Sequence, residues 1–188
     1  MGDGVRRWVV TGTPGAGKTT LCGALAVRGH AVVRESATDV MAAYGSGPQP
    51  WGAGTDSPLD EIAALQRRRE LEPLPAEVDH VVLDRSPVCT LALARHMGYD
   101  VPPGLAAELD RIERDGPYER RVLYVEWLGY LTPTDVRRID EADTLRFDRI
   151  HRETYLELGY ELVEVPVLPI EDRVALVESV IGPAAPAG

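Results

Sequence analysis

The sequence predicts a single α/β domain in which helices flank a five-stranded parallel sheet. Two observations predict this fold. Near-continuous apolar runs alternate with helical patterns along the chain, as in parallel sheets that are covered on both faces. A glycine-rich loop also separates the first apolar run from the first helical pattern. The chain has 188 residues, of which 44% are hydrophobic, so it is long enough to bury one sizeable core.

The N-terminal half supplies three of the expected strands. Residues 7–11 are β-rich, the glycine-rich loop follows, and 19–27 form a helix opened by that loop. A second strand is expected at 31–34, then a polar turn and a helix to about Tyr44. Gly and Pro mark 45–57 as a loop, whereas 58–71 place apolar residues near one helical face. The apolar run 78–83 is the third strand, and it ends at Asp84.

The C-terminal half supplies the remaining two strands. Helices are expected after Asp84 to about Met97 and at 103–114, followed by a strand at 121–127. A helix at 143–158 stops at Gly159, the fifth strand covers 160–165, and the last helix covers 169–181. We expect residues 1–181 to form the domain, with a mobile lid at about 128–142 and a disordered tail at 182–188.

Composition excludes several classes of function. The formal net charge is −10, which argues against a general nucleic-acid binder, since such proteins carry a basic face. No apolar run approaches the length of a membrane span, and the N-terminus has no signal-peptide pattern, so a cytoplasmic protein without membrane contact is expected. Cys22 and Cys89 lack metal or redox spacing, and we expect both to be reduced core residues.

The glycine-rich loop is the strongest functional signal. Its pattern Gly-x-x-x-x-Gly-Lys-Thr is that of a P-loop, whose backbone N–H groups and helix N-terminus bind nucleotide phosphates. Lys18 is the single lysine of the chain, and its compact ammonium suits the space between phosphate oxygens better than a guanidinium. The predicted cofactors are ATP and Mg²⁺, and the loop residues expected to bind them are Gly12, Pro14, Gly15, Ala16, Gly17, Lys18, Thr19 and Thr20.

A second signal stands where the third strand ends. Asp84 follows an apolar strand, as a Walker B acid does, and its carboxylate is expected to hold Mg²⁺ together with the Thr19 hydroxyl. Arg85 and Ser86 follow directly, at the sheet edge where ligands of such folds bind. The interpretation is therefore a P-loop NTPase.

Asp84-Arg85-Ser86 resembles the Asp/Glu-Arg-Ser/Tyr element of deoxynucleoside and thymidylate kinases. The whole chain is similar to the small "AAA-domain" P-loop ATPase/kinase family related to nicotinamide riboside kinases, on residues 11–20, 66–70 and 152–166. The resemblance implies a nucleoside/nucleotide-kinase-like fold with a mobile lid. It also implies that Arg85 contacts the transferred phosphoryl group or the acceptor, and that Val167 lies near the adenine.

The same resemblance places Glu35 where these kinases have their catalytic base. Glu35 could instead cap the following turn or pair with Arg34, and Asp39 is the substitute base. Two arginines of the lid, Arg137 and Arg138, are expected to offset charge in the transition state, although a solvated charged helix explains them nearly as well.

The acceptor side is more weakly encoded. Tyr44 precedes the loop 45–57 and Trp51 lies within it, and either ring could stack on an acceptor or simply anchor the loop. Helical spacing points Gln66 and Arg69 in one direction, either into the cleft or onto a charged outer face.

The leading hypothesis is an ATP-dependent phosphotransferase that moves the γ-phosphate to a hydroxyl of a nucleoside-like or other small acceptor. The alternative is a nucleotide-dependent regulatory ATPase acting on a protein partner. A kinase of RNA ends is opposed by the acidic charge, and the oligomeric state, monomer or homodimer, stays open.

Overall fold

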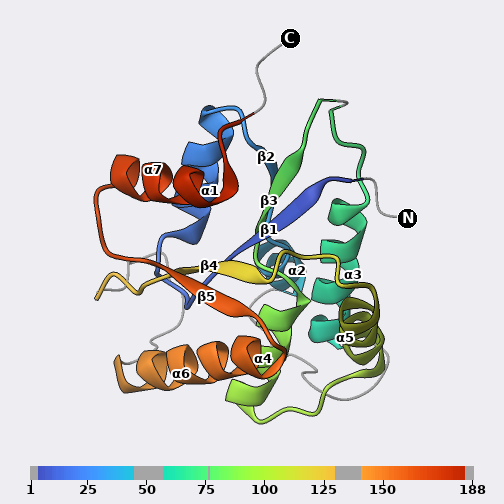
Figure 1. The fold of residues 1–188 in the computed structure, drawn as a ribbon. Coiled ribbons are helices and arrows are strands. Elements are labelled where there is room, and N and C mark those ends of the chain that lie inside the picture. Colours follow the sequence, from blue (N-terminus) through green and yellow to red (C-terminus); the bar gives the residue numbers. More distant parts are fainter. Residues whose placement is uncertain (1–3, 45–56, 76, 130–140, 185–188) are drawn as a thin grey trace.

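The structure of the chain is a computed structural model that describes residues 4–44, 57–75, 77–129 and 141–184. Its five strands form one parallel sheet in the order β2-β3-β1-β4-β5, as Figure 1 shows. The strands are β1 (Arg6–Thr11), β2 (Ala31–Val33), β3 (His80–Asp84), β4 (Arg121–Val125) and β5 (Glu161–Val165). The predicted single-domain α/β fold with five parallel strands is therefore confirmed.

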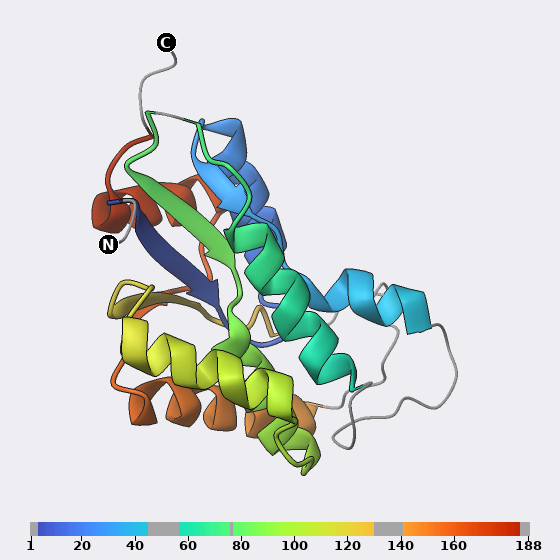
Figure 2. The same cartoon turned by 90° about the vertical axis from the view of Figure 1, so that its right-hand side faces the viewer.

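Helices cover both faces of this sheet (Figure 1). The first face is covered by α1 (Lys18–Val27) and α7 (Ile170–Ile181). The opposite face is covered by α4 (Pro87–Met97), α5 (Pro103–Asp115) and α6 (Glu141–Glu157). Beside α4 and α5 lies α3 (Pro58–Glu70), and α2 (Ala37–Tyr44) extends outward from the end of β2 in Figure 2.

The sheet is buried on both faces, which explains why its strands are continuous apolar runs rather than alternating ones. In β1, Trp8 and Val10 belong to the core under α1 and α7, whereas Val9 belongs to the core under the other helices. All five residues of β3 are buried, including the terminal Asp84. The strands thus bring their carboxyl ends, and the polar residues that stand there, to one edge.

Local signals in the sequence set the helix ends. Ser57 caps α3 by accepting a hydrogen bond from the Leu59 N–H at 3.3 Å, and Pro58 stands at the first helical position, where no intrahelical N–H is needed. Gly98 ends α4 in the left-handed conformation. Most other ends lie within one or two residues of the sequence prediction, the usual scatter of frayed termini.

Two parts of the predicted domain plan lie largely outside the described residues. Of the predicted lid, residues 130–140 are not described, and α6 begins at Glu141, inside the range predicted for the lid. Of the predicted tail, residues 182–184 follow α7 without regular structure, and 185–188 are not described. Both cysteines are free and buried, as predicted. Among the described helices, none combines the length and apolarity needed to cross a membrane.

Candidate functional site

The loop between β1 and α1 has a backbone that only glycine adopts readily. Gly12, Gly15 and Gly17 have φ angles of 134°, 76° and 82°, a region that L side chains rarely enter. A Cβ atom at Gly12 would also collide with the carbonyl oxygen of Val125 in β4. The glycines therefore permit both the tight turn and its close approach to the neighbouring strand.

Gly12→Ala is accordingly expected to destabilise the protein by about 2 kcal/mol or more, because both φ and the neighbouring carbonyl oppose the added methyl group. The measurement is thermal or urea unfolding. Gly23→Ala is a matched control, since Gly23 lies within α1 and an added Cβ meets nothing within 4 Å. That change should stabilise by about 0.5–1 kcal/mol. Equal melting temperatures for both variants would contradict the assignment.

Lys18 begins α1 and turns back over the loop. Its ammonium donates a hydrogen bond to the Thr13 carbonyl oxygen at 2.5 Å, and the residue is 4% exposed. Burial, with a further contribution from Arg85, lowers the pKa of Lys18 from 10.5 to about 7, and Asp84 partly opposes this shift. The negative groups around Lys18 therefore do not fully compensate its charged ammonium for burial.

Anion binding should reverse that shift, and the direction is testable. An anion beside Lys18 favours the charged ammonium and raises its pKa back toward 10.5, so above about pH 7 binding takes up a proton. At about pH 8 we expect uptake of close to one proton with Mg²⁺-ATP, and much less at about pH 6, where Lys18 is already charged. The number of protons taken up on binding is measured by calorimetry in Tris and in HEPES, whose ionisation enthalpies differ. Equal heats in both buffers at the higher pH would contradict this expectation.

Thr19 and Asp84 meet at the sheet edge. The Thr19 hydroxyl donates to Asp84 Oδ2 at 2.8 Å, whereas the buried Oδ1 has no hydrogen-bond partner among the described residues. Burial raises the pKa of Asp84, and Arg85 is the largest opposing influence. A hydroxyl and an unpartnered carboxylate oxygen fit a Mg²⁺ ion that takes its other ligands from phosphates and water.

Arg85 continues directly from β3 in a strained conformation. Its φ angle is 74°, the single positive value among the described non-glycine residues, and its N–H donates to the Val10 carbonyl oxygen at 2.9 Å. Its guanidinium Nε lies 3.8 Å from the Glu35 carboxylate. The backbone strain of this residue is of the kind that clusters at functional sites.

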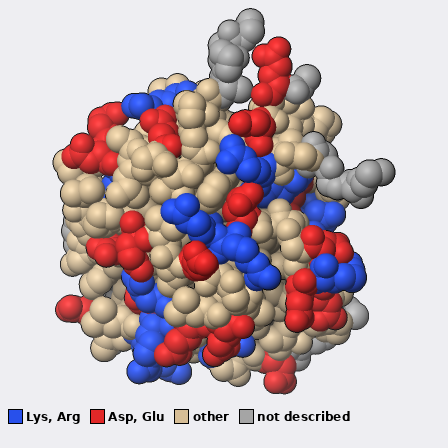
Figure 3. All heavy atoms as spheres, in the orientation of Figure 1, with Lys and Arg blue, Asp and Glu red and all other residues tan. Residues whose placement is uncertain are grey.

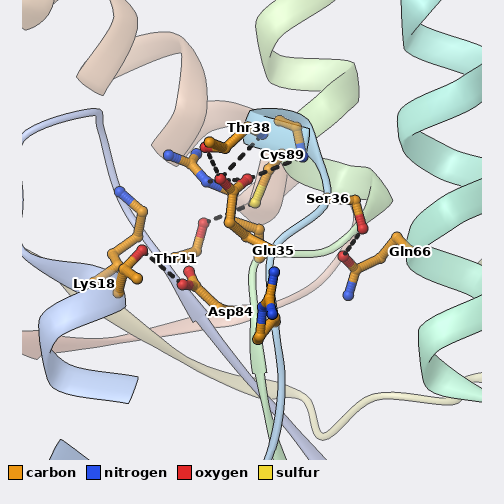
Figure 4. Close-up of polar contacts among 12 residues, drawn as sticks. Thr11, Lys18, Glu35, Ser36, Thr38, Gln66, Asp84 and Cys89 are labelled. Carbon is orange, nitrogen blue, oxygen red and sulfur yellow. Dashed lines mark hydrogen bonds and ion pairs between the residues drawn. The ribbon is translucent and has the colours of Figure 1, made fainter. Parts of the chain in front are cut away.

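Glu35 lies beyond the end of β2, between the loop residues and α3 (Figure 4). Its carboxylate accepts hydrogen bonds from the N–H groups of Ala37 and Thr38, at 3.0 and 3.1 Å, and from the Thr38 hydroxyl. Glu35 therefore caps α2, one of the alternatives that the sequence left open, and pairs with Arg85 rather than with Arg34. Capping also fixes the carboxylate at the sheet edge.

Asp39, in the first turn of α2, forms ion pairs with two arginines. It pairs with Arg34 at 3.2 Å and with Arg69 at shorter range. The Arg69 hydrogen bond is the main cause that lowers the pKa of Asp39. Arg69 also donates to the Glu35 carbonyl oxygen, so it ties α3 to the start of α2.

Gln66 and Arg69 both lie on the side of α3 that faces residues 35 and 36. Gln66 is 2% exposed and accepts a hydrogen bond from the Ser36 hydroxyl at 3.0 Å, as Figure 4 shows. Its Nε2 group has no partner in the part of the chain that the structure describes. Tyr44 donates to Glu61 and so joins α2 to α3.

Three predicted site residues, Trp51, Arg137 and Arg138, lie outside the described residues. Val167 follows β5 and is 51% exposed. The other predicted positions converge on the carboxyl ends of β1, β2 and β3 and on the adjacent helices, where Figure 4 draws several of them.

Sequence analysis missed Arg173 in α7. This arginine is 3% exposed and donates to the carbonyl oxygens of Ala16 at 3.1 Å and Pro166 at 2.9 Å. Arg173 thus links the loop between β1 and α1 to the segment that follows β5. Its position in the first half of a helix gives no sequence signal of this contact, which depends on how α7 packs beside α1.

Sequence analysis also missed a network of buried polar side chains at the carboxyl end of β1. Thr11 contacts His151 Nε2 at 2.7 Å and Cys89 Sγ at 3.1 Å, and the Tyr155 hydroxyl contacts both Cys89 Sγ and Ser86. Burial lowers the pKa of His151 well below its usual value. Helix α6 therefore supports both the end of β1 and the residue that follows Arg85.

An open cavity of about 510 Å³ extends outward from Thr19 and Asp84, between α1 and the β2–α2 connection. Thr19, Glu35 and Asp84 stand on it, together with side chains from both walls. The wall residues are Cys22, Gly23, Ala26, Val32, Arg34, Thr38 and Asp39. Over the face drawn in Figure 3, basic and acidic side chains are intermixed.

Comparison with solved structures places this geometry in the P-loop nucleotide-kinase fold. A deoxyadenosine kinase from M. mycoides has a TM-score of 0.57 at 13% identity, over 93% of this chain and 98% of that one. Thymidylate kinases from Ehrlichia chaffeensis and Candida albicans have TM-scores of 0.60 and 0.55 at 15% and 11% identity. They cover 94% of this chain in both cases, and 98% and 91% of their own. At such identities the likeness shows the fold alone.

No curated protein matches the sequence at a significant level. One family model, described as an AAA domain, matches residues 7–173. This range runs from β1 into α7 and includes the phosphate loop, Glu35 and Asp84-Arg85-Ser86. The chain therefore belongs to this AAA-domain family of P-loop proteins, with a nucleoside- and nucleotide-kinase-like fold.

Proposed function

We propose that the protein is an ATP-dependent kinase that transfers the γ-phosphate of Mg²⁺-ATP to a hydroxyl group of a small acceptor. One observation carries the proposal. The Glu35–Arg85 pair stands beside the Thr19–Asp84 pair, so a carboxylate suited to take a proton adjoins residues suited to hold a triphosphate. The nucleoside and nucleotide kinases that share the fold support this function.

On the donor side, the loop residues Gly12 to Thr20 hold the triphosphate. Backbone N–H groups and Lys18 contact the phosphates, Thr19 and Asp84 hold Mg²⁺, and Val167 borders the adenine. When bound, the metal neutralises charge on the phosphate oxygens. Arg173 keeps the loop in place, and we propose that Arg137 and Arg138, which lie outside the described residues, contact the phosphates.

On the acceptor side, Glu35 accepts the proton of the acceptor hydroxyl. The hydroxyl oxygen bonds to the γ-phosphorus as the bond from that phosphorus to the β–γ bridging oxygen breaks, and ADP leaves. Arg85, held at 3.8 Å from Glu35, offsets the charge on the transferred group. The Nε2 group of Gln66 is buried and has no partner among the described residues, and we propose that it contacts the acceptor, as do Asp39, Tyr44, Trp51 and Arg69.

The second candidate is a regulatory ATPase that acts on a protein partner. It is favoured by the capping role of Glu35, because a carboxylate that only caps α2 leaves the site without a base. Such a protein would hydrolyse ATP slowly, and a partner would accelerate the hydrolysis.

A transfer assay separates the two functions. The purified protein is incubated with Mg²⁺-ATP and a panel of nucleosides, sugars and aminocyclitols, and mass spectrometry detects a gain of one phosphoryl group. We expect at least one acceptor to gain it. Release of inorganic phosphate alone across a broad panel, with ATP bound, would refute the kinase and support the ATPase.

A further inference from the structure

We infer that Tyr155 of α6 is a positioning residue for the phosphoryl transfer and that it acts through Ser86 on Arg85. The inference rests on the proposed kinase function. It extends that function to a helix that carries none of the residues assigned to the nucleotide or to the acceptor.

Arg85 needs support from its neighbours because its backbone is strained. A residue with a side chain keeps a φ angle such as 74° only where the surrounding structure imposes it. Before Arg85, β3 pairs with β1, and the Arg85 N–H donates to the Val10 carbonyl oxygen at 2.9 Å. After Arg85, the chain passes through Ser86 into α4. Support from the C-terminal side is therefore support of Ser86.

The Ser86 hydroxyl makes an unusual contact for its position. Ser86 stands at the N-cap of α4, where a serine hydroxyl usually accepts an N–H of the first helical turn. Here it makes no such bond to the described helix and instead contacts the Tyr155 hydroxyl at 2.8 Å. Both side chains are buried, and burial raises the pKa of Tyr155 well above its usual value. The phenol therefore keeps its proton and stays a partner for Ser86 at neutral pH.

Tyr155 is itself held by side chains that lead to the phosphate loop. Its hydroxyl contacts Cys89 Sγ at 3.1 Å, and Cys89 Sγ contacts the Thr11 hydroxyl at 3.1 Å (Figure 4). Its ring stacks on His151, whose Nε2 contacts the same Thr11 hydroxyl at 2.7 Å. Thr11 is the last residue of β1 before the phosphate loop. These contacts thus tie Ser86 to the start of the loop that holds the donor.

Release of Ser86 should affect the rate of transfer rather than the binding of ATP. The Arg85 guanidinium lies 3.8 Å from the Glu35 carboxylate, so relaxation of the Arg85 backbone would move the group that offsets charge on the transferred phosphoryl. A misplacement of about 1 Å can cost about 100-fold in rate. The donor loop stays supported, because Thr11 keeps its contacts with His151 and Cys89.

Tyr155→Phe tests the inference, since it removes the hydroxyl and keeps the ring that stacks on His151. The substrate is whichever nucleoside, sugar or aminocyclitol gains a phosphoryl group in the transfer assay. We expect kcat to fall about tenfold or more while the affinity for Mg²⁺-ATP, measured by calorimetry, stays the same. Tyr160→Phe is the matched control, because its ring is also buried and packs edge-on against Tyr155. An unchanged kcat in Tyr155→Phe would overturn the inference and leave the kinase function standing.

Combined variants test the route from Tyr155 to Arg85. Ser86→Ala removes the other end of the same contact, so it should lower kcat by a similar factor, and the double variant should lose no more than either single one. Tyr155→Phe made in Arg85→Met should likewise cause no further loss. Losses that multiply in these combinations would overturn the route.

Two further outcomes are distinguishable. If Tyr155→Phe does not fold, Ser86→Ala tests the same contact alone, and an unchanged kcat there would overturn the inference. If the unaltered protein transfers a phosphoryl group to no member of the panel, the kinase function itself is refuted, and the inference is refuted with it.

Discussion

Replacing Lys18 by methionine is expected to abolish the binding of Mg²⁺-ATP while the fold remains intact. The ammonium is the one lysine charge in the chain, and it is buried at the centre of the loop. We expect affinity for Mg²⁺-ATP to fall about 100-fold or more, because the guanidinium of Arg173, which also contacts the loop, is bound to the carbonyl oxygens of Ala16 and Pro166. Calorimetry measures the affinity.

The stability of the same variant supplies its control. Burial lowers the pKa of Lys18 from 10.5 to about 7, which means that the folded protein holds the charged form at a cost at and below neutral pH. Removing the charge should therefore leave the melting temperature unchanged or raise it. Lys18→Arg restores a charge but not the compact ammonium, and it too should lose affinity. Native affinity in the methionine variant would contradict the assignment.

Glu35→Gln is expected to lower kcat for phosphoryl transfer by about 100-fold or more, with little change in the affinity for ATP. Glutamine keeps the size of the side chain and one oxygen that can accept the hydrogen bonds from Thr38, whereas its amide NH₂ group cannot accept the bond that the Ala37 N–H donates to the other carboxylate oxygen. It cannot accept the proton of the acceptor. The measurement is transfer under saturating ATP, together with calorimetry for ATP.

A helix-cap variant elsewhere separates catalysis from capping. Ser57→Ala removes the side-chain cap of α3 and should cost about 1 kcal/mol in stability. If Glu35 served only as a cap, both variants would lower the melting temperature and leave kcat per folded molecule unchanged. Loss of kcat in Glu35→Gln alone is the result that the catalytic role requires.

The donor side and the sheet could be predicted because their signals are local. The loop Gly12 to Thr19 depends on glycines at fixed spacing, and Asp84 ends an apolar run that had to be a buried strand. The parallel order of strands follows from their alternation with helices. Even the common direction of Gln66 and Arg69 followed from helical spacing within α3.

The remaining parts depend on contacts between distant segments. Arg173 supports Ala16 from another helix, and His151 reaches Thr11 across the sheet edge, so neither has a local pattern. The pairing of Asp39 with Arg69 likewise joins two helices whose relative position is set by packing. Acceptor specificity also depends on contacts between distant segments, because the small residues that line the cavity, such as Gly23 and Ala26, belong to no sequence motif.

The central claim is that the loop around Lys18 is shaped to bind the phosphate tail of a nucleotide, and one calorimetric series tests it most directly. The unaltered protein is titrated with ATP, ADP and AMP in the presence of Mg²⁺. We predict that affinity falls from ATP to ADP and is lost with AMP, since the contacts are made to the outer phosphates. Equal affinity for AMP and ATP, or no binding of any of them, would contradict the claim.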